Sequence, residues 1–127
     1  MRRILTAAQM KAADENTIQK MEIPSLVLME RAALACVDEL LNGTWDTKRV
    51  LAVCGPGNNG GDGAAVARIL KTKGVDAELF CIGNSEKYRE GMRVQKKIAE
   101  NYGVREVKNP VFSEYTVIID AIFGIGV

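Results

Sequence analysis

A glycine-rich segment constrains this chain more than any other feature of its sequence. Residues 55–63 read GPGNNGGDG, so five of the nine positions are glycine. The segment follows a short apolar run at 49–54 and precedes a helical pattern at 62–73. Glycine lets the backbone approach a ligand closely, and the N–H groups that open a helix attract phosphate. A strand, a glycine loop and a helix in this order predict a nucleotide-binding α/β unit.

The remaining pattern alternates strands and helices. Apolar runs of strand length and helical patterns occupy the following ranges: strands at 49–54, 77–82 and 115–121, a weaker strand at 103–107, and helices at 7–20, 25–41, 62–73 and 86–102. Thr6 is expected to cap the first helix and Asn42-Gly43 to close the second in a left-handed turn. With right-handed crossovers, this order predicts an α/β fold with a mainly parallel sheet. The 127 residues suit a single domain, 1–127.

Composition excludes several classes of function. The chain has no histidine, which excludes histidine acid–base catalysis and histidine-ligated metals. Its net charge of +1 argues against a nucleic-acid or membrane-surface partner. Cys36, Cys54 and Cys81 lie in separate apolar runs, so they are expected to be buried core thiols. Without a signal peptide or a long apolar span, we expect a soluble cytoplasmic protein.

The glycine segment departs from the ordinary dinucleotide fingerprint. Gly55, Gly57 and Gly60 match GxGxxG, but the second strand ends in CIGN, without the carboxylate that usually binds the ribose. This disfavours the nucleotide-binding module of a dehydrogenase. The segment instead carries Asn58, Asn59 and Asp62, which offer hard oxygen ligands and hydrogen-bond donors. The simpler alternative is a tight turn in which Asp62 caps the next helix.

Asp120 is the second unusual residue, because it lies inside the apolar run VIIDAIF. A carboxylate there is costly unless it is paired or ligates a cation. Ligands of open parallel sheets bind beyond the carboxyl ends of the strands. We therefore expect Asn58, Asn59 and Asp120 to converge at this edge. A structural salt bridge for Asp120 is the alternative.

These motifs resemble the NAD(P)H-hydrate epimerase family, the YjeF N-terminal domain. The resemblance rests on GPGNNGGDG after a strand, the preceding PSLVLMERAALAC, the following VIIDAIFGIG and the opening AAQMKAADENTI. It implies a Rossmann-like three-layer α/β/α sandwich. It also implies an isomerase that interconverts the R and S epimers of hydrated NADH and NADPH, in the repair of damaged nicotinamide nucleotides. It also implies homodimers, for which the wide apolar surface of helix 25–41 is suited, and a fused or separate dehydratase as a partner.

The resemblance further implies the site residues. It places a potassium ion at Asn59 and Asp120. The implied substrate-binding positions are Asn58, Asn59, Gly60, Gly61, Asp62, Gly124, Ile125, Gly126 and Val127. Epimerisation needs a proton donor and acceptor, and without histidine a carboxylate is the natural candidate. Asp120 is accordingly our candidate catalytic residue.

The family domain is longer than this chain. The sequence ends inside the turn that begins at Gly124, so we expect an incomplete domain. A non-catalytic nucleotide-binding or interaction module of the same fold, like the mRNA-decapping scaffold that resembles it, is the alternative function. The basic residues of helix 86–102, among them Arg89, are expected to be solvated, with phosphate steering as the less favoured reading.

Overall fold

The computed structural model of the chain describes residues 3–6 and 24–122. Its strands form one five-stranded sheet in the order β1-β5-β2-β3-β4, and every neighbouring pair is parallel. The strands are β1 (Arg3–Thr6), β2 (Arg49–Cys54), β3 (Asp76–Cys81), β4 (Arg105–Glu106) and β5 (Val117–Ala121). The described helices are α3 (Ser25–Asn42), α4 (Asn58–Thr72) and α5 (Glu90–Asn101), with 3₁₀ turns η1 (Ser85–Lys87) and η2 (Phe112–Glu114).

The sheet order creates a switch point beside the central strand. β2 lies between β3, which follows it in the chain, and β5, which follows much later. In open parallel sheets such a change of direction leaves a crevice beyond the carboxyl ends of the strands. The glycine segment leaves β2 at this end.

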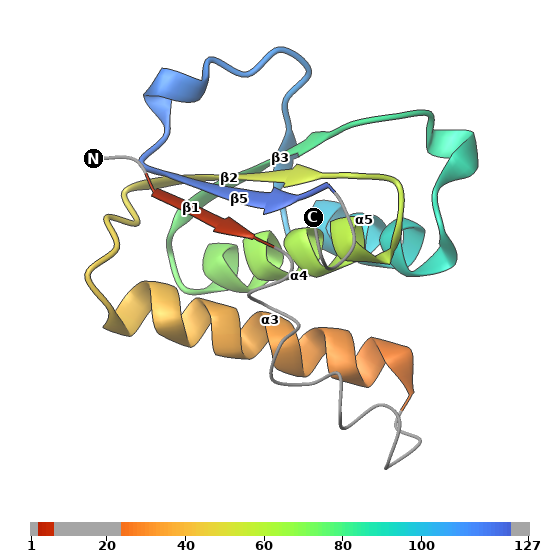
Figure 1. Cartoon of the computed structure of the whole chain (residues 1–127), viewed down its shortest axis with the longest axis horizontal. Helices are drawn as coiled ribbons and strands as arrows, with labels where there is room; N and C mark the ends of the chain where they lie inside the picture. The colour runs from red at the N-terminus through yellow and green to blue at the C-terminus, as the bar shows by residue number, and fades with distance from the viewer. Residues whose placement is uncertain (1–2, 7–23, 123–127) are drawn as a thin grey trace.

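The described helices lie together on one face of the sheet (Figure 1). α4 packs against β2, β3 and β5, while α3 and α5 pack against α4. The core between them is made of small and branched side chains, for example Val37, Leu40, Ala52, Val66 and Ile119. On the other face, Leu51 and Val53 are buried with Tyr115. This smaller cluster includes partly exposed apolar side chains from β3 and β5.

The Rossmann-like α/β fold that the resemblance implies is confirmed, and the described sheet is entirely parallel. Two of the three expected layers lie within the described residues, because the described helices cover one face of the sheet. The strand at 49–54 has the predicted bounds, and α3 extends one residue beyond the predicted 25–41. Two local predictions are wrong. Gly43 ends α3 in an extended conformation, with φ −93° and ψ −158°, not in a left-handed turn. The predicted helix 86–102 is divided into η1 and a shorter α5.

The structure contains a strand, β1, that was not predicted. Its last residue is Thr6, which was expected to cap a helix. The expected helix at 7–20 lies outside the described residues. Cys36 and Cys54 are buried as expected, but Cys81 is half-buried. Within the described ranges, none of the helices is long and apolar enough to cross a membrane.

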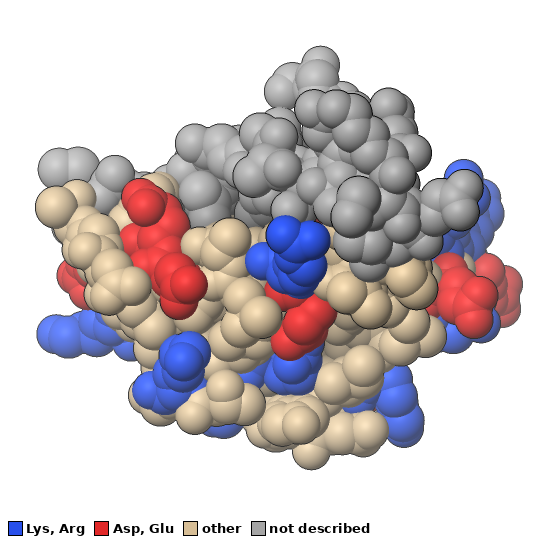
Figure 2. Space-filling model, turned by 90° about the horizontal axis from the view of Figure 1, so that it is seen from below, with Lys and Arg blue, Asp and Glu red and all other residues tan. Residues whose placement is uncertain are grey.

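Charge is mixed over the face of the molecule on the side of α3. Figure 2 views the molecule from the side of α3 and shows acidic and basic groups interspersed with uncharged surface. No large area of one sign dominates this view, which agrees with the formal net charge of +1.

Candidate functional site

Backbone hydrogen bonds fix the start of the glycine segment between two strands. The Gly55 N–H donates to the Ala121 carbonyl at 2.9 Å, and the Ile82 N–H donates to the Cys54 carbonyl at 2.8 Å. The ends of β5, β2 and β3 are thereby joined where the segment begins. A Cβ at Gly55 would collide with the Ile122 carbonyl, so only glycine fits this approach of two backbones.

The NNGGDG sequence is the first turn and a half of α4, not a loop before it. Gly57 is the N-cap and has no capping side chain, and Asn58 is the first helical residue. Asp62 therefore does not cap the helix; it is buried within it, with 2% of its surface exposed. Glycine disfavours helix intrinsically, but here packing decides. A Cβ at Gly60 would overlap the Gly55 carbonyl, and one at Gly61 would lie 2.5 Å from the Met29 methyl.

The two asparagines present different environments. Asn58 is exposed, and its Oδ1 lies close to Gly91, where an added Cβ would be 2.6 Å away. Asn59 is half-buried, and its buried Oδ1 has no hydrogen-bond partner among the residues that the structure describes. A buried, unpaired carbonyl oxygen is costly unless a ligand or ion satisfies it.

Asp120 is half-buried on β5. Its Oδ1 accepts a 3.2 Å hydrogen bond from the Ile122 N–H, and no ion pair to it is found in the described part of the chain. The salt-bridge alternative therefore finds no support there. Asp120 alternates along β5 with residues buried under α4, so its side chain belongs to the opposite face.

The structure brings the predicted site residues together in part. The glycine segment and the end of β5 meet through Gly55 and Ala121. No direct hydrogen bond between Asn59 and Asp120 is found among the described groups. The predicted binding positions Gly124, Ile125, Gly126 and Val127 lie outside the described residues.

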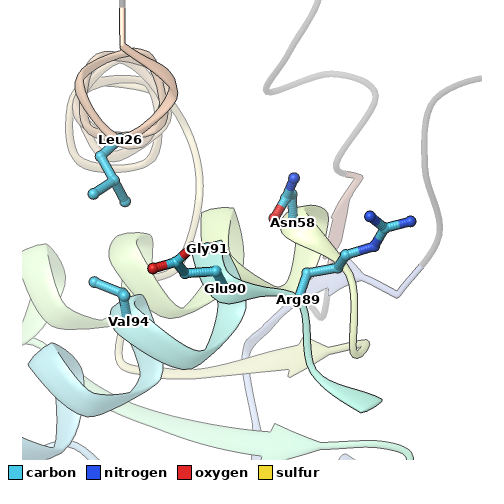
Figure 3. A pocket seen from close by; sticks show the side chains of 6 residues that line it. All are labelled: Leu26, Asn58, Arg89, Glu90, Gly91 and Val94. Atoms are coloured by element: carbon cyan, nitrogen blue, oxygen red, sulfur yellow. The ribbon is translucent and has the colours of Figure 1, made fainter.

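A cavity of about 440 Å³ adjoins the start of α4. It lies where the first turns of α3, α4 and α5 meet, and its lining residues are Leu26, Asn58, Arg89, Glu90, Gly91 and Val94. In Figure 3, Leu26 and Val94 approach from opposite sides at one end, while Asn58 and Arg89 lie at the other. The volume is within the range of small-molecule sites. One end of the cavity is thus apolar, the other carries an amide and a guanidinium, and the Glu90 carboxylate lies between the two ends.

Sequence reasoning missed the cavity and gave Arg89 only a minor role. Arg89 precedes α5 as its N-cap residue, and its N–H donates to the Pro56 carbonyl at 2.8 Å. This bond ties the start of α5 to the glycine segment. The proximity is a tertiary property of two helix starts 32 positions apart (Asn58 and Glu90) and has no local sequence signal.

Glu78 is unavailable as a ribose ligand, because other side chains occupy it. Its Oε1 accepts from Tyr115 at 2.6 Å, and its Oε2 accepts from Arg105 at 3.0 Å. Burial tends to raise the pKa of Glu78, but these hydrogen bonds and the charges of Arg105 and Arg49 outweigh it and lower that pKa. The residue acts as a structural carboxylate, which agrees with the disfavoured dehydrogenase reading.

Comparisons with known proteins agree on one family. Residues 25–127 match the family described as "YjeF-related protein N-terminus". A protein of Weissella koreensis named NAD(P)H-hydrate epimerase is 47% identical over 96% of this chain and 56% of its own length. One of Oenococcus oeni with the same name is 49% identical, over 96% of this chain and 59% of its own length. The chain thus spans less than two thirds of these relatives.

Solved structures give the same result for the fold. The crystal structure of the yeast protein ynu0, YNL200c, superimposes with a TM-score of 0.66 at 28% sequence identity. The match covers 96% of this chain and 57% of the yeast chain.

Proposed function

The chain belongs to the family of YjeF-related protein N-termini, and we propose that it acts as an NAD(P)H-hydrate epimerase that interconverts the R and S epimers of hydrated NADH and NADPH. The observation that carries the proposal is the opening turn of α4. Two asparagines and the uncapped N–H groups of a helix lie there at the switch point of the sheet, beside the strand that holds Asp120. The names of the relatives in Weissella koreensis and Oenococcus oeni support the same activity.

Asp120 is proposed to move the proton. The substrate carries a hydroxyl on a carbon next to a ring nitrogen. Protonated Asp120 donates to that hydroxyl, the C–O bond breaks, and water leaves as the nitrogen lone pair forms an iminium. Water then adds to the other face and returns its proton to the Asp120 carboxylate. The carboxylate formed in between also stabilises the transient positive charge.

A potassium ion fits the oxygen atoms at this edge. The unpaired Oδ1 of Asn59 and the carboxylate of Asp120 are the hard donors that such a cation prefers. We propose that these two residues hold it. A bound cation would supply fixed positive charge that orients Asp120. A cation beside this carboxylate would also make Asp120 a stronger acid when protonated and a weaker base when ionised, so it would favour proton donation to the substrate and oppose the return of the proton.

The cavity beside Asn58 is proposed to take the charged part of the substrate. Arg89 is the one cationic residue that lines it among the described residues. A guanidinium and helix N–H groups together suit a diphosphate. The opposite, apolar end formed by Leu26 and Val94 suits an aromatic ring.

A homodimer through α3 is part of the proposal. Val27, Leu34 and Leu41 are spaced seven residues apart, so they share one side of the helix. They are 47%, 44% and 39% exposed, which is unusual for three aligned aliphatic side chains. Burial against the same surface of a second copy would cover them. We further propose that the protein works in the cytoplasm with a dehydratase that consumes one epimer.

Equilibration of the two epimers tests the function. The complete protein that carries this sequence is incubated with purified S-NADH hydrate, and the epimers are separated by chromatography. The proposal predicts approach to the R/S equilibrium well above the spontaneous rate. Binding of the hydrate without any acceleration would favour a non-catalytic module of the same fold instead.

A further inference from the structure

Two cysteines lie side by side at the ends of β2 and β3, next to the start of the glycine segment. Cys54 and Cys81 are register partners at the last positions of β2 and β3. Both contact the core on the helix-covered face, so their side chains leave the sheet on the same side. Neighbouring strands lie about 4.8 Å apart. This separation falls inside the Cα–Cα range of roughly 4.4–6.8 Å that a disulfide requires.

The two thiols differ in access and acidity. Cys54 is fully buried, whereas Cys81 is half-buried. The neighbouring Cys54 thiol lowers the pKa of Cys81, and the neighbouring Cys81 thiol together with burial raises the pKa of Cys54. Lys96 and Lys108 also lower the pKa of Cys81, against the opposing effects of burial and of Glu106. Cys81 is therefore the more accessible and more nucleophilic member.

The third cysteine provides an internal comparison. Cys36 lies on α3, away from the sheet register, and burial raises its pKa to about 12. It has no partner thiol in register, and its pKa is not lowered. It should therefore be inert under conditions in which the pair reacts.

We propose that Cys54 and Cys81 are a redox modification site, at which a low-molecular-weight disulfide such as oxidised glutathione converts the two thiols into a reversible disulfide. Cys81 is the attacking residue and Cys54 the resolving one. The proposal is independent of the epimerase activity, because it rests on the register and environment of the pair. The sequence predicts buried core thiols, and a reversible bond between two of them is compatible with that position.

The exchange proceeds in two balanced steps. The Cys81 thiolate attacks one sulfur of the oxidant, its S–S bond breaks, and one half leaves as a thiolate that takes up a proton. Cys54 then loses its proton and attacks Cys81 Sγ, and the second half leaves in the same way. Two protein thiols are oxidised by two electrons, and one disulfide is reduced to two thiols.

A disulfide between Cys54 and Cys81 would lie next to the glycine segment. Cys54 is followed directly by Gly55, whose backbone is held against β5. The Cβ atoms of register partners stand about as far apart as the strands, slightly beyond the roughly 3.5–4.5 Å that a relaxed disulfide prefers. The strand ends must therefore approach each other for the bond to form. A bond of this kind is readily reduced again.

Mass spectrometry of the oxidised chain tests the proposal. The reduced chain is incubated with oxidised glutathione, freed of the oxidant, unfolded in the presence of N-ethylmaleimide and digested. We expect a peptide pair joined through Cys54 and Cys81, alkylated Cys36, and recovery of both thiols after dithiothreitol. Recovery of Cys54 and Cys81 as free thiols, under conditions that fully oxidise a small-molecule dithiol, would overturn the proposal.

Single substitutions test the assigned order of attack. In Cys54→Ala, we expect Cys81 to stop at the mixed disulfide with glutathione. In Cys81→Ser, modification of Cys54 should slow by at least about tenfold, because the remaining thiol is buried. Cys36→Ala should behave like the unsubstituted chain. If glutathione modified Cys54 in the Cys81→Ser chain as fast as it modifies Cys81 in the Cys54→Ala chain, the assigned order of attack would be contradicted. The measurement on the unsubstituted chain remains decisive if a variant does not fold.

Discussion

The hydroxyl of Tyr115 donates a 2.6 Å hydrogen bond to Glu78 Oε1, although the two residues are 37 positions apart in the sequence. Arg105 and Arg49 also reach this carboxylate, at 2.7 and 3.3 Å. The group is buried on the sheet face opposite α4, with 6% of its surface exposed. It ties β3 to the connection that leads into β5.

Replacement of Glu78 by Gln should destabilise the chain and flatten its dependence on pH. The pKa of Glu78 is lowered in the folded state, so its contribution is present above the unfolded value, about 4.3, and is lost as the pH falls below it. Loss of the charge should cost about 1–3 kcal/mol near neutral pH. Urea unfolding between neutral pH and about pH 3.5 should show the two chains converging in acid.

The matched control is Glu100→Gln. Glu100 pairs with Lys96 on an exposed part of α5, so its loss should change the free energy of unfolding by less than about 0.5 kcal/mol. A Glu78→Gln chain as stable as this control at every pH would show that the buried carboxylate contributes nothing.

Alanine should destabilise the chain at Gly60 and leave its stability almost unchanged at Gly57. A Cβ at Gly60 would overlap the Gly55 carbonyl, whereas one at Gly57 meets nothing within 4 Å. Gly57 also has an ordinary φ of −86°. We expect Gly60→Ala to lose about 1–3 kcal/mol or more of stability through overpacking, and Gly57→Ala to stay within about 0.5 kcal/mol. Thermal unfolding monitored by circular dichroism compares them; equal stability would refute the close packing of this turn.

These glycines also show what the sequence could and could not predict. Strand, glycine segment and helix were predictable because apolar runs and glycine clusters are local signals. The start of α4 at Asn58 was not, since NNGGDG is a poor helix by propensity. Its close packing against Gly55, Met29, Gly91 and Ala121 is a tertiary property. β1 was missed because a four-residue strand at the sheet edge carries too little pattern.

The residues of the candidate site likewise fall into those that local sequence signals predict and those that only tertiary packing brings in. The sequence was enough to find Asn58, Asn59 and Asp120. Polar residues are unusual in a glycine segment and in a buried strand, and this is visible without any knowledge of the tertiary structure. Arg89 and Gly91 reach the site only through the packing of α5 against α4, and a charged residue on a helix normally suggests solvent. Cys81 was expected in the core for a similar reason: an apolar run does not reveal which residue lies at the end of a strand.

Potassium should stabilise the protein through Asn59. If the ion binds the folded state alone, a concentration ten times its dissociation constant adds about 1.4 kcal/mol. We expect potassium chloride to raise the thermal midpoint above that in lithium chloride at equal ionic strength. Asn59→Leu should abolish the difference, whereas the neighbouring Asn58→Leu should retain it. An identical midpoint in both salts would refute a potassium site.

A charge on the exposed side of α3 should dissociate the proposed dimer. Leu34 lies in the middle of the aligned aliphatic side chains and is 44% exposed. Leu34→Glu would bury a charge in the interface, so the dissociation constant should rise by at least about tenfold. Sedimentation equilibrium measures it. Val111→Glu, at an equally exposed position away from α3, is the control; a monomeric unsubstituted protein would contradict the dimer.

Epimer equilibration by Asp120→Asn tests the central claim most directly. The matched control is Asp46→Asn. Asp46 is exposed, and its Oδ1 accepts a local hydrogen bond from the Lys48 N–H, which asparagine preserves. Both variants are made in the complete protein, checked for folding by circular dichroism, and incubated with S-NADH hydrate. The account predicts that Asp120→Asn loses acceleration by at least about a hundredfold while Asp46→Asn retains it. Equilibration by Asp120→Asn at the rate of the unsubstituted protein would contradict the assignment of proton transfer to Asp120.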